Sequence, residues 1–320
     1  MPTDTGQTTA AHEGWQEPGT DEQWSDSFYF GGGDGRGLAF YSRIGRRPNE
    51  GKVEGALGVW LPGEGFLLSF GRAKDASEIA CGAVSFRCLD PLVLWELRLE
   101  GQGRLFERAE HVGTNRDRYR TVDVGGWLRF TSWHPPLSFR SGLAEWVATD
   151  HYEQPGSIAG VIEAGDGRWP LAGNGLRDHS WGVRDWQQVP FWRWFGMVVD
   201  PDNFAMVNNV GLSGGGEAAG GFVMRKGEIA PVASCDTDSE LDMRHGWQRR
   251  FEARVTDDLG RETVLHGEAL EVAPLRQRRA GRVTFVNEAL TEYRWEDRRA
   301  IGISEYLVQQ PAGGNGAGRG

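Results

Sequence analysis

The sequence predicts an all-β fold in which two domains of antiparallel strands, each a barrel or a sandwich, follow one another. Apolar and polar residues alternate with a period of two through most of the chain, as in strands with one buried face. Gly, Asp, Asn and Pro interrupt the alternating runs at spacings typical of hairpin turns. The periodicity of amphipathic helices is almost absent, so we expect few helices.

The first half of the chain shows this alternation most clearly at residues 92–100. Val93 and Trp95 fall on one face of that run, whereas Glu96 and Arg98 fall on the other. Turns at 62–65 and 165–167 are rich in glycine, which favours hairpins. We expect strands of the first domain at 28–30, 38–44, 53–61, 66–70, 83–88, 92–100, 127–133 and 144–154.

The second half repeats the pattern after a glycine-containing segment at 173–175. The sequence Asp-Pro-Asp-Asn at 200–203 predicts a tight turn between its first two strands. We expect strands at 192–199, 204–210, 221–225, 249–256, 262–273, 282–293 and 302–308. The first domain is placed at 15–170 and the second at 171–310, and the glycine-rich residues 311–320 are expected to form a disordered tail.

Composition and charge indicate which kinds of partner and which cellular location to expect. The 320 residues carry a formal net charge of −10, and no basic run is long enough to follow a phosphate backbone, so we expect no nucleic-acid partner. No apolar stretch reaches the length of a membrane helix, and residues 1–22 lack the apolar core of a signal peptide. We therefore expect a cytoplasmic protein whose three cysteines are reduced thiols. The 14 tryptophans and 47 glycines indicate broad aromatic surfaces and many tight turns.

The segment 175–186 carries the strongest functional signal, because titratable and aromatic side chains alternate within it. We expect it to leave a turn and form an irregular loop, with Asp178 and His179 as an acid–base pair. A carboxyl group beside Trp181 in a dry pocket would have a raised pKa and act as a proton donor. The alternative is structural: Arg177–Asp178 and Arg184–Asp185 would be ion pairs that join two sheets, and the tryptophans would be core.

A second polar constellation lies at 150–155. In a strand, His151 and Glu153 share one face, where the pair would orient a proton donor or, with His179, bind a metal. The alternative is a satisfied polar pair on an inward-facing strand, and we expect no metal.

An aromatic strand follows, with Trp192 and Trp194 on one face and Arg193 on the other. Tryptophan faces stabilise a passing carbocation, although core packing is the more usual role of such residues. Asn208 and Asn209 on the next strand are suited to holding a substrate hydroxyl. The chain lacks a GxSxG sequence, a phosphate-binding loop and a CxxC sequence, so we expect no cofactor.

Three short motifs together resemble a known superfamily. They are HxEQ at 151–154, RDHSWG followed by RDW at 177–186, and GxxEY at 302–306. This set resembles the two-domain lipocalin-like superfamily, which includes carotenoid 1,2-hydratases, AttH-like proteins and lipocalin-type Diels–Alderases, and it is most similar to a bacterial branch of that group. The resemblance implies two lipocalin-like domains.

The resemblance also implies roles for individual residues. In the hydratases, the His and Trp of this motif and an Asp on a following strand are implicated in protonating an isoprenoid double bond. His179 and Trp181 match the first two, but the strand at 204–210 carries Asn where the Asp would stand. Because an amide is not a proton donor of that kind, Asp178, Asp185 or Glu153 would have to replace it, or the protein does not protonate alkenes.

These observations favour a cofactor-independent enzyme that acts on an isoprenoid-, steroid- or polyketide-like molecule by hydration, dehydration, isomerisation or cyclisation. A carrier of a similar ligand and a structural or interaction protein are the alternatives. The enzyme hypothesis predicts that His151, Glu153, Asp178 and His179 converge on one cavity near the domain junction. The substrate-binding set would be Trp181, Asp185, Trp186, Trp192, Trp194, Asn208 and Asn209.

Overall fold

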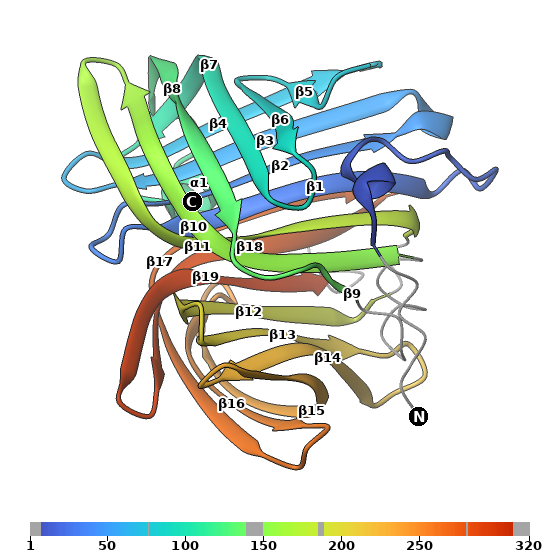
Figure 1. Cartoon of the computed structure of the whole chain (residues 1–320). Coiled ribbons are helices and arrows are strands. Elements are labelled where there is room, and N and C mark those ends of the chain that lie inside the picture. Colours follow the sequence, from blue (N-terminus) through green and yellow to red (C-terminus); the bar gives the residue numbers. More distant parts are fainter. Residues whose placement is uncertain (1–7, 76, 139–149, 185–188, 280, 310–320) are drawn as a thin grey trace.

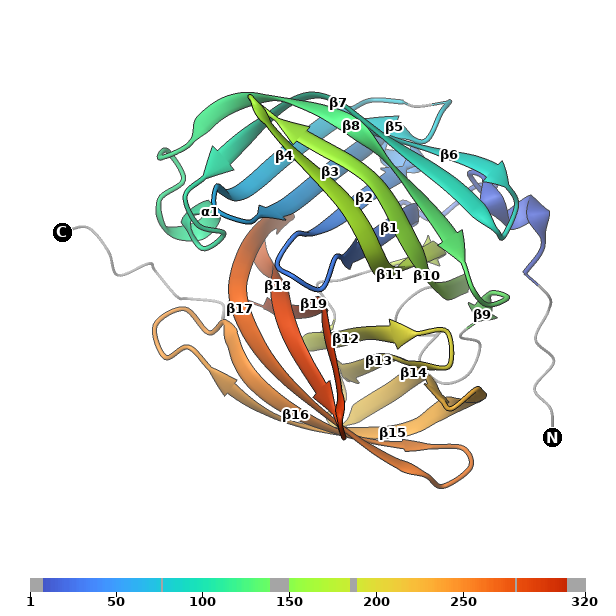
Figure 2. The same cartoon turned by 60° about the vertical axis from the view of Figure 1, so that its left-hand side comes forward.

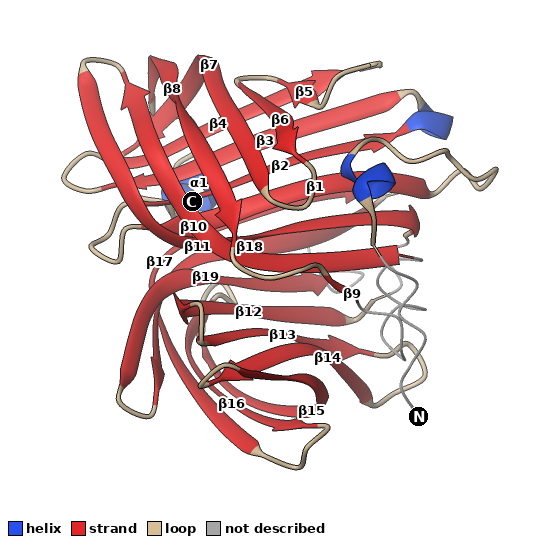
Figure 3. Ribbon diagram, viewed as in Figure 1, coloured by secondary structure: helices blue, strands red, loops and turns tan. Residues whose placement is uncertain are grey.

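The structure, a computed structural model, describes residues 8–75, 77–138, 150–184, 189–279 and 281–309. Strands make up most of these residues and helices very few (Figure 3), which confirms the predicted all-β class. The helical elements are short: η1(Ala10–Glu13), η2(Pro48–Glu50) and α1(His111–Thr114).

The first half of the chain forms an antiparallel sheet of eleven strands. Its strand order is β4-β3-β2-β1-β11-β10-β8-β7-β6-β5, and β9 pairs with β10. Because β4 also pairs with β7 at residues 66–68, eight of these strands form a closed path. The strands are β1(Trp24–Gly33), β2(Ala39–Arg47), β3(Lys52–Leu61), β4(Gly65–Ala73), β5(Ala80–Cys81), β6(Val84–Asp90), β7(Leu94–Phe106), β8(Arg120–Ser132), β9(Leu137–Ser138), β10(Asp150–Ala164) and β11(Gly167–Val183).

The second half forms a closed barrel in which each strand pairs with the next along the chain. Its strands are β12(Phe191–Asp200), β13(Asn203–Gly211), β14(Glu217–Arg225), β15(Glu228–Leu241), β16(Gln248–Asp257), β17(Glu262–Arg279), β18(Arg282–Trp295) and β19(Arg298–Gln309). The barrel lies against the first sheet, so that β12 and β19 face β11 and β1 (Figures 1 and 2). Two lipocalin-like β domains in tandem describe this architecture.

The strands differ from the sequence-based expectation in several places, and the short strands β5 and β9 are among those not expected. Residues 177–183, expected as an irregular loop, are the second half of β11; that prediction was wrong because this segment is paired along both edges, with β1 and with β10. Residue 170 consequently lies inside a strand of the first sheet, and the barrel begins at Phe191. Strand β15 was not predicted, because its outward face is too polar for its alternation to be noticed. The predicted tail, 311–320, and residues 144–149 of a predicted strand lie outside the described residues.

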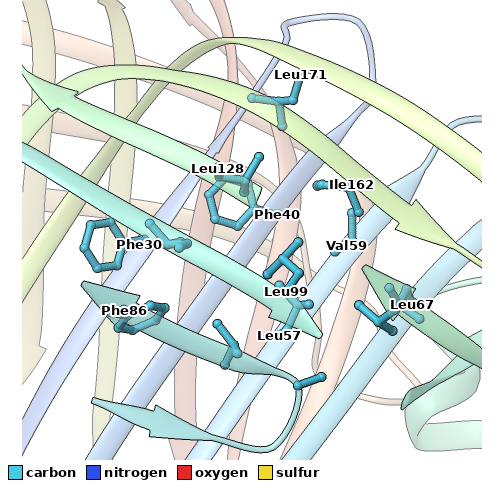
Figure 4. Close-up of a cluster of buried hydrophobic side chains, with 14 of the residues drawn as sticks. Phe30, Phe40, Leu57, Val59, Leu67, Phe86, Leu99, Leu128, Ile162 and Leu171 are labelled. Carbon is cyan, nitrogen blue, oxygen red and sulfur yellow. The ribbon is translucent and has the colours of Figure 1, made fainter. Parts of the chain in front are cut away.

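Alternation along the strands divides the apolar side chains among three clusters. Phe30, Phe40 and Leu128 belong to the core of the first domain (Figure 4), where burial of each such side chain contributes about 1.5–3 kcal/mol. Phe195 and Phe251 lie in the interior of the barrel.

The third cluster fills the junction between the two domains, and we call it the junction layer. It contains residues of the outer face of the first sheet, such as Tyr29, Tyr41 and Trp60, and residues of the outer face of the barrel, such as Trp194 and Phe204. The two domains therefore meet through an extended apolar and aromatic surface. Its composition resembles that of the core of a single domain.

The three cysteines are free, and Cys81 and Cys235 are buried. Burial raises the pKa of all three thiols, to about 11 for Cys88 and Cys235. Among the described residues, no helix is long and apolar enough to cross a membrane.

Candidate functional site

Strand β11 presents the predicted acid–base residues to two different places. Successive side chains of a strand point to opposite faces, so Asp178 and His179 cannot share one site. The ring of His179 stacks on Phe28 of the first-domain core with centroids 3.7 Å apart. Asp178, in contrast, interacts electrostatically with Glu288 and Glu305 of the barrel. The expected convergence of all four polar residues on one cavity is therefore wrong, and the cause is the strand conformation of 177–183.

On the first-domain face, His179 links β1 to the N-terminal segment. Its Nε2 lies 2.7 Å from Oδ1 of Asp26, and its Nδ1 lies 2.8 Å from the carbonyl oxygen of His12. The carbonyl only accepts, so Nδ1 carries a proton. The Asp26 carboxylate also accepts the Gln16 N–H at 2.7 Å. These hydrogen bonds join β1, β11 and the N-terminal segment.

Arg177 forms a second buried link to the same N-terminal segment. Its Nη2 donates to both carboxylate oxygens of Glu13, at 2.9 and 3.0 Å. Glu13 also accepts hydrogen bonds from Tyr152 and, at 2.8 Å, from the indole of Trp95. Burial raises the pKa of Glu13, but Arg177 and these hydrogen bonds outweigh it and leave the pKa below its ordinary value. The Arg177–Asp178 ion pair of the structural alternative is thus replaced by Arg177–Glu13, and Trp181 stacks on His12.

On the junction face, a row of side chains crosses four neighbouring strands. Arg43, Tyr29, Asp178 and Glu153 are successive cross-strand partners on β2, β1, β11 and β10. Cross-strand partners have adjacent side chains, so this row forms one continuous polar line within the junction layer. Glu153 belongs to it together with Asp178, whereas His179 does not.

The barrel supplies a second row that faces the first. Glu288, Glu305 and Trp194 are cross-strand partners on β18, β19 and β12. The rings of Trp194 and Tyr29 meet edge to face with centroids 5.8 Å apart, which connects the two rows directly. Carboxyl groups from both domains therefore lie together in the junction layer.

Burial and like charge perturb the acids of these rows strongly. Burial, the carboxyl of Glu305 and that of Asp178 raise the pKa of Glu288 well above its ordinary range. Burial raises the pKa of Glu305 to about 7, with Asp178 adding to the effect and Arg43 opposing it. Burial and the neighbouring Arg43 lower the pKa of Arg184 to about 10. We call Asp178, Glu288, Glu305, Arg43 and Arg184 the junction cluster.

The junction cluster keeps some contact with solvent. Asp178, Arg43 and Glu305 are half-buried, although Glu288 and Arg184 beside them are buried.

The remaining predicted residues have partners within the protein. His151 Nε2 lies 3.1 Å from Oε1 of Glu153, which also accepts the indole N–H of Trp194 at 3.2 Å, so the predicted histidine–carboxylate contact exists. Asn208 accepts the indole N–H of Trp192 at 2.8 Å.

Asn209 points into the barrel instead of the junction and bonds to Glu217 and to the carbonyl of Cys235. A role for Asn209 at the junction is therefore wrong, because it lies on the opposite face of β13 from Asn208. Asp185 and Trp186 lie outside the described residues. Within the part of the chain that the structure describes, no group of three or more His, Cys, Asp or Glu side chains is arranged to hold a metal ion.

Comparison with protein families gives a match over residues 9–310 to the domain of unknown function DUF7064. The chain belongs to this family. No curated protein matches the sequence.

Solved structures share the fold of this DUF7064 protein at low sequence identity. An AttH candidate from Nitrosomonas europaea is 14% identical with a TM-score of 0.57, over 91% of this chain and 93% of that one. Kievitone hydratase from Nectria haematococca is 7% identical with a TM-score of 0.56, over 90% and 89%. CghA with Sch210972 is 10% identical with a TM-score of 0.55, over 90% and 89%. At these identities the likeness extends to the fold alone.

Most residues of the junction cluster of this DUF7064 member were not predicted from the sequence. Glu305 lies in the GxxEY motif, but no role was assigned to it, and Glu288, Arg43, Tyr29 and Tyr41 were not singled out. One available signal was the charge at Glu288 between Val286 and Leu290, on the apolar face of a strand. A carboxyl in such a position is buried and needs a partner.

Replacement of Glu305 by Gln should remove part of the pH dependence of stability. The pKa of Glu305 is about 7 in the folded protein against an ordinary 4.5, so the native state holds its proton more tightly than the unfolded state. The stabilisation that the protonated Glu305 carboxyl gives the folded protein is complete below pH 4.5, and it is lost as the pH rises to about 7. At pH 8 we expect the variant to be more stable than the wild type by about 1–2 kcal/mol, since partial exposure reduces the full effect.

Urea unfolding at pH 4.5, 6 and 8 measures this effect. Glu292→Gln on the neighbouring strand β18 is the control, because that side chain is 44% exposed and should leave the pH profile unchanged. A difference between Glu305→Gln and wild type that is equal at all three pH values would contradict the expectation.

Proposed function

We propose that the protein is an enzyme that acts on a hydrophobic small molecule at the junction between its two domains. The observation that carries the proposal is the meeting of Asp178 from the first sheet with Glu288 and Glu305 from the barrel, within a layer that is otherwise apolar and aromatic. Removal of several carboxyl groups from water is energetically unfavourable. Such clusters are typical of acid–base sites. A junction that served only to join the domains would gain more from apolar side chains.

The electrostatics of the cluster suit proton transfer near neutral pH. A carboxyl group such as Glu305, with a pKa of about 7, both donates and accepts protons there. Asp178, on the opposite side of the junction, is the residue to which we assign removal or delivery of the second proton. Trp192 and Trp194 form apolar walls, and the His151–Glu153 pair fixes the orientation of Trp194 through its indole N–H.

The reaction class that this arrangement supports is hydration, dehydration, isomerisation or cyclisation by acid–base chemistry without a redox cofactor. The substrate would be isoprenoid-, steroid- or polyketide-like. The occurrence of a hydratase among proteins of the same fold supports this choice. His179 belongs to the first-domain face, and we assign it a positioning role: it fixes β11, the strand that carries Asp178.

The Asp178→Asn substitution tests the proposal. Wild-type protein is incubated with a panel of polycyclic ketones, alcohols and polyenes, and products are identified by liquid chromatography with mass spectrometry. We expect conversion of at least one compound, and a loss of turnover of about 100-fold or more in the variant with its melting temperature unchanged. Asp123→Asn, at an exposed position of β8, is the matched control.

Two outcomes would count against the enzyme. Compounds that bind tightly but are never converted indicate a carrier. Equal turnover by wild type and Asp178→Asn removes Asp178 from the chemistry.

A further inference from the structure

Several buried polar atoms in the junction layer have no hydrogen-bond partner within the described residues, and three of them belong to side chains that interact electrostatically with Glu305. These three are the hydroxyl oxygens of Tyr29 and Tyr41 and Oε2 of Glu288. These side chains are only 7%, 1% and 3% exposed, so bulk water does not reach them freely. A buried polar atom without a partner typically costs about 1–3 kcal/mol, which makes three at one place an arrangement that needs an explanation.

The three atoms belong to one neighbourhood although they come from both domains. Glu288 and Glu305 act electrostatically on both phenols, and after burial they are the main causes of the raised pKa of Tyr29 and Tyr41. The ring of Tyr29 extends over Gly31, the cross-strand partner of Tyr41, where a Cβ atom would lie 3.0 Å from the phenol oxygen. Tyr41 extends over Gly58, where a Cβ atom would lie 2.2 Å from the ring. The glycines leave the space that both rings occupy.

Glu288 and Glu305 share a proton beside the two phenols. Glu288 and Glu305 stand directly opposite each other on β18 and β19, and their carboxyl groups are hydrogen-bonded to one another. Two carboxyl groups bond directly only when one of them is protonated, because two carboxylates have no donor between them. The pair therefore stores a proton beside the two phenols.

We propose that the hydroxyl groups of Tyr29 and Tyr41 recognise a carbonyl oxygen on an otherwise apolar ligand, beside the proton that the Glu288–Glu305 pair holds. A carbonyl oxygen accepts two hydrogen bonds, one from each phenol. Aromatic rings of the junction layer, such as Trp60 against Tyr41, lie beside this position and suit an apolar ligand. This inference rests on the proposed function and specifies its substrate class.

The proton transfer is balanced within the cluster. One O–H bond breaks in the carboxyl pair and one bond to hydrogen forms on the ligand, so the pair gains one negative charge, while Asp178 removes a second proton from the ligand. Arg43 and Arg184 of the junction cluster lie near enough to oppose that charge electrostatically. After the product leaves, solvent carries a proton from Asp178 back to the carboxyl pair, which restores the cluster.

The first experiment detects the stored proton without any ligand. Infrared spectra of wild-type protein at pH 7 should contain the C=O band of a protonated carboxyl group that shifts in D₂O. The Glu288→Gln/Glu305→Gln double variant should lack that band, and Glu292→Gln should retain it. A wild-type spectrum identical to that of the double variant overturns the proposal, and this result does not depend on whether the protein is an enzyme.

The second experiment tests recognition with a matched pair of probes, 2-acetylnaphthalene and 2-ethylnaphthalene, which differ by a carbonyl oxygen. Calorimetry should show that the ketone binds to the wild type at least about tenfold more tightly, as expected for two hydrogen bonds. The Tyr29→Phe/Tyr41→Phe variant should bind both probes equally, with the affinity for the ethyl compound unchanged. Equal affinities in the wild type, or no binding of either probe, overturn the proposal, whereas loss of turnover in Asp178→Asn bears on the proposed function alone.

Discussion

Replacement of Arg177 by Met is expected to lower the free energy of unfolding by about 3–5 kcal/mol. The guanidinium is fully buried, and it donates to both carboxylate oxygens of Glu13 and to Gln154. Without it, Glu13 would remain as an uncompensated buried charge, hydrogen-bonded only to neutral groups such as Trp95 and Tyr152. The pKa of Glu13 should then rise, because burial would no longer be opposed by Arg177.

Guanidinium chloride unfolding of the variant measures this loss. Arg98→Met is the control: its pair with Glu96 is similar in geometry, at 3.0 Å, but the arginine is 65% exposed. Surface pairs of this kind contribute about 0–1 kcal/mol. If the two variants lost the same stability, the buried ion pair would not be what anchors the N-terminal segment to the first domain.

The second large effect is expected for Trp194→Ala, with a loss of about 3–5 kcal/mol. Trp194 is 7% exposed, packs edge to face against Tyr29 and donates its indole N–H to Glu153 at 3.2 Å. Truncation leaves a cavity between the domains and removes a hydrogen bond from a buried carboxylate. Trp194→Phe keeps most of the ring, so it should show mainly the loss of that hydrogen bond.

Thermal unfolding with a matched control checks this expectation. Trp127, on β8, is 43% exposed, and Trp127→Ala should cost much less. If Trp194→Ala were as mild as Trp127→Ala, the junction layer would be loosely packed, and the walls that we assign to the site would be misplaced.

The sequence was sufficient to predict what depends on local alternation. The shared face of His151 and Glu153, and that of Trp192 and Trp194, follow from the two-residue period of a strand. The same rule, applied to 177–183, would have separated Asp178 from His179. The segment was interpreted as a loop because the glycines at 173–175 indicated a turn before it, but those residues are themselves paired within β11.

What could not be predicted depends on contacts between distant parts of the chain. Glu13 and Asp26 reach Arg177 and His179 across about 150 residues. No local pattern specifies which strand lies beside which, because pairing is decided by the closure of the whole barrel. The two strands that carry Glu288 and Glu305 were expected from the sequence. Their register, which places the two residues opposite each other, follows from the turn that joins the strands.

Because neighbouring side chains of β11 contact different parts of the protein, the length of this strand cannot vary freely. Its Arg177 and His179 side chains hold the N-terminal segment, and Asp178 between them faces the barrel. Insertion or deletion of one residue upstream within the strand would exchange the two faces, which would bury Asp178 in the first core and place His179 against the second domain. Homologous chains are therefore free to differ in length at the exposed turn after β13 and not between Gly175 and Trp181.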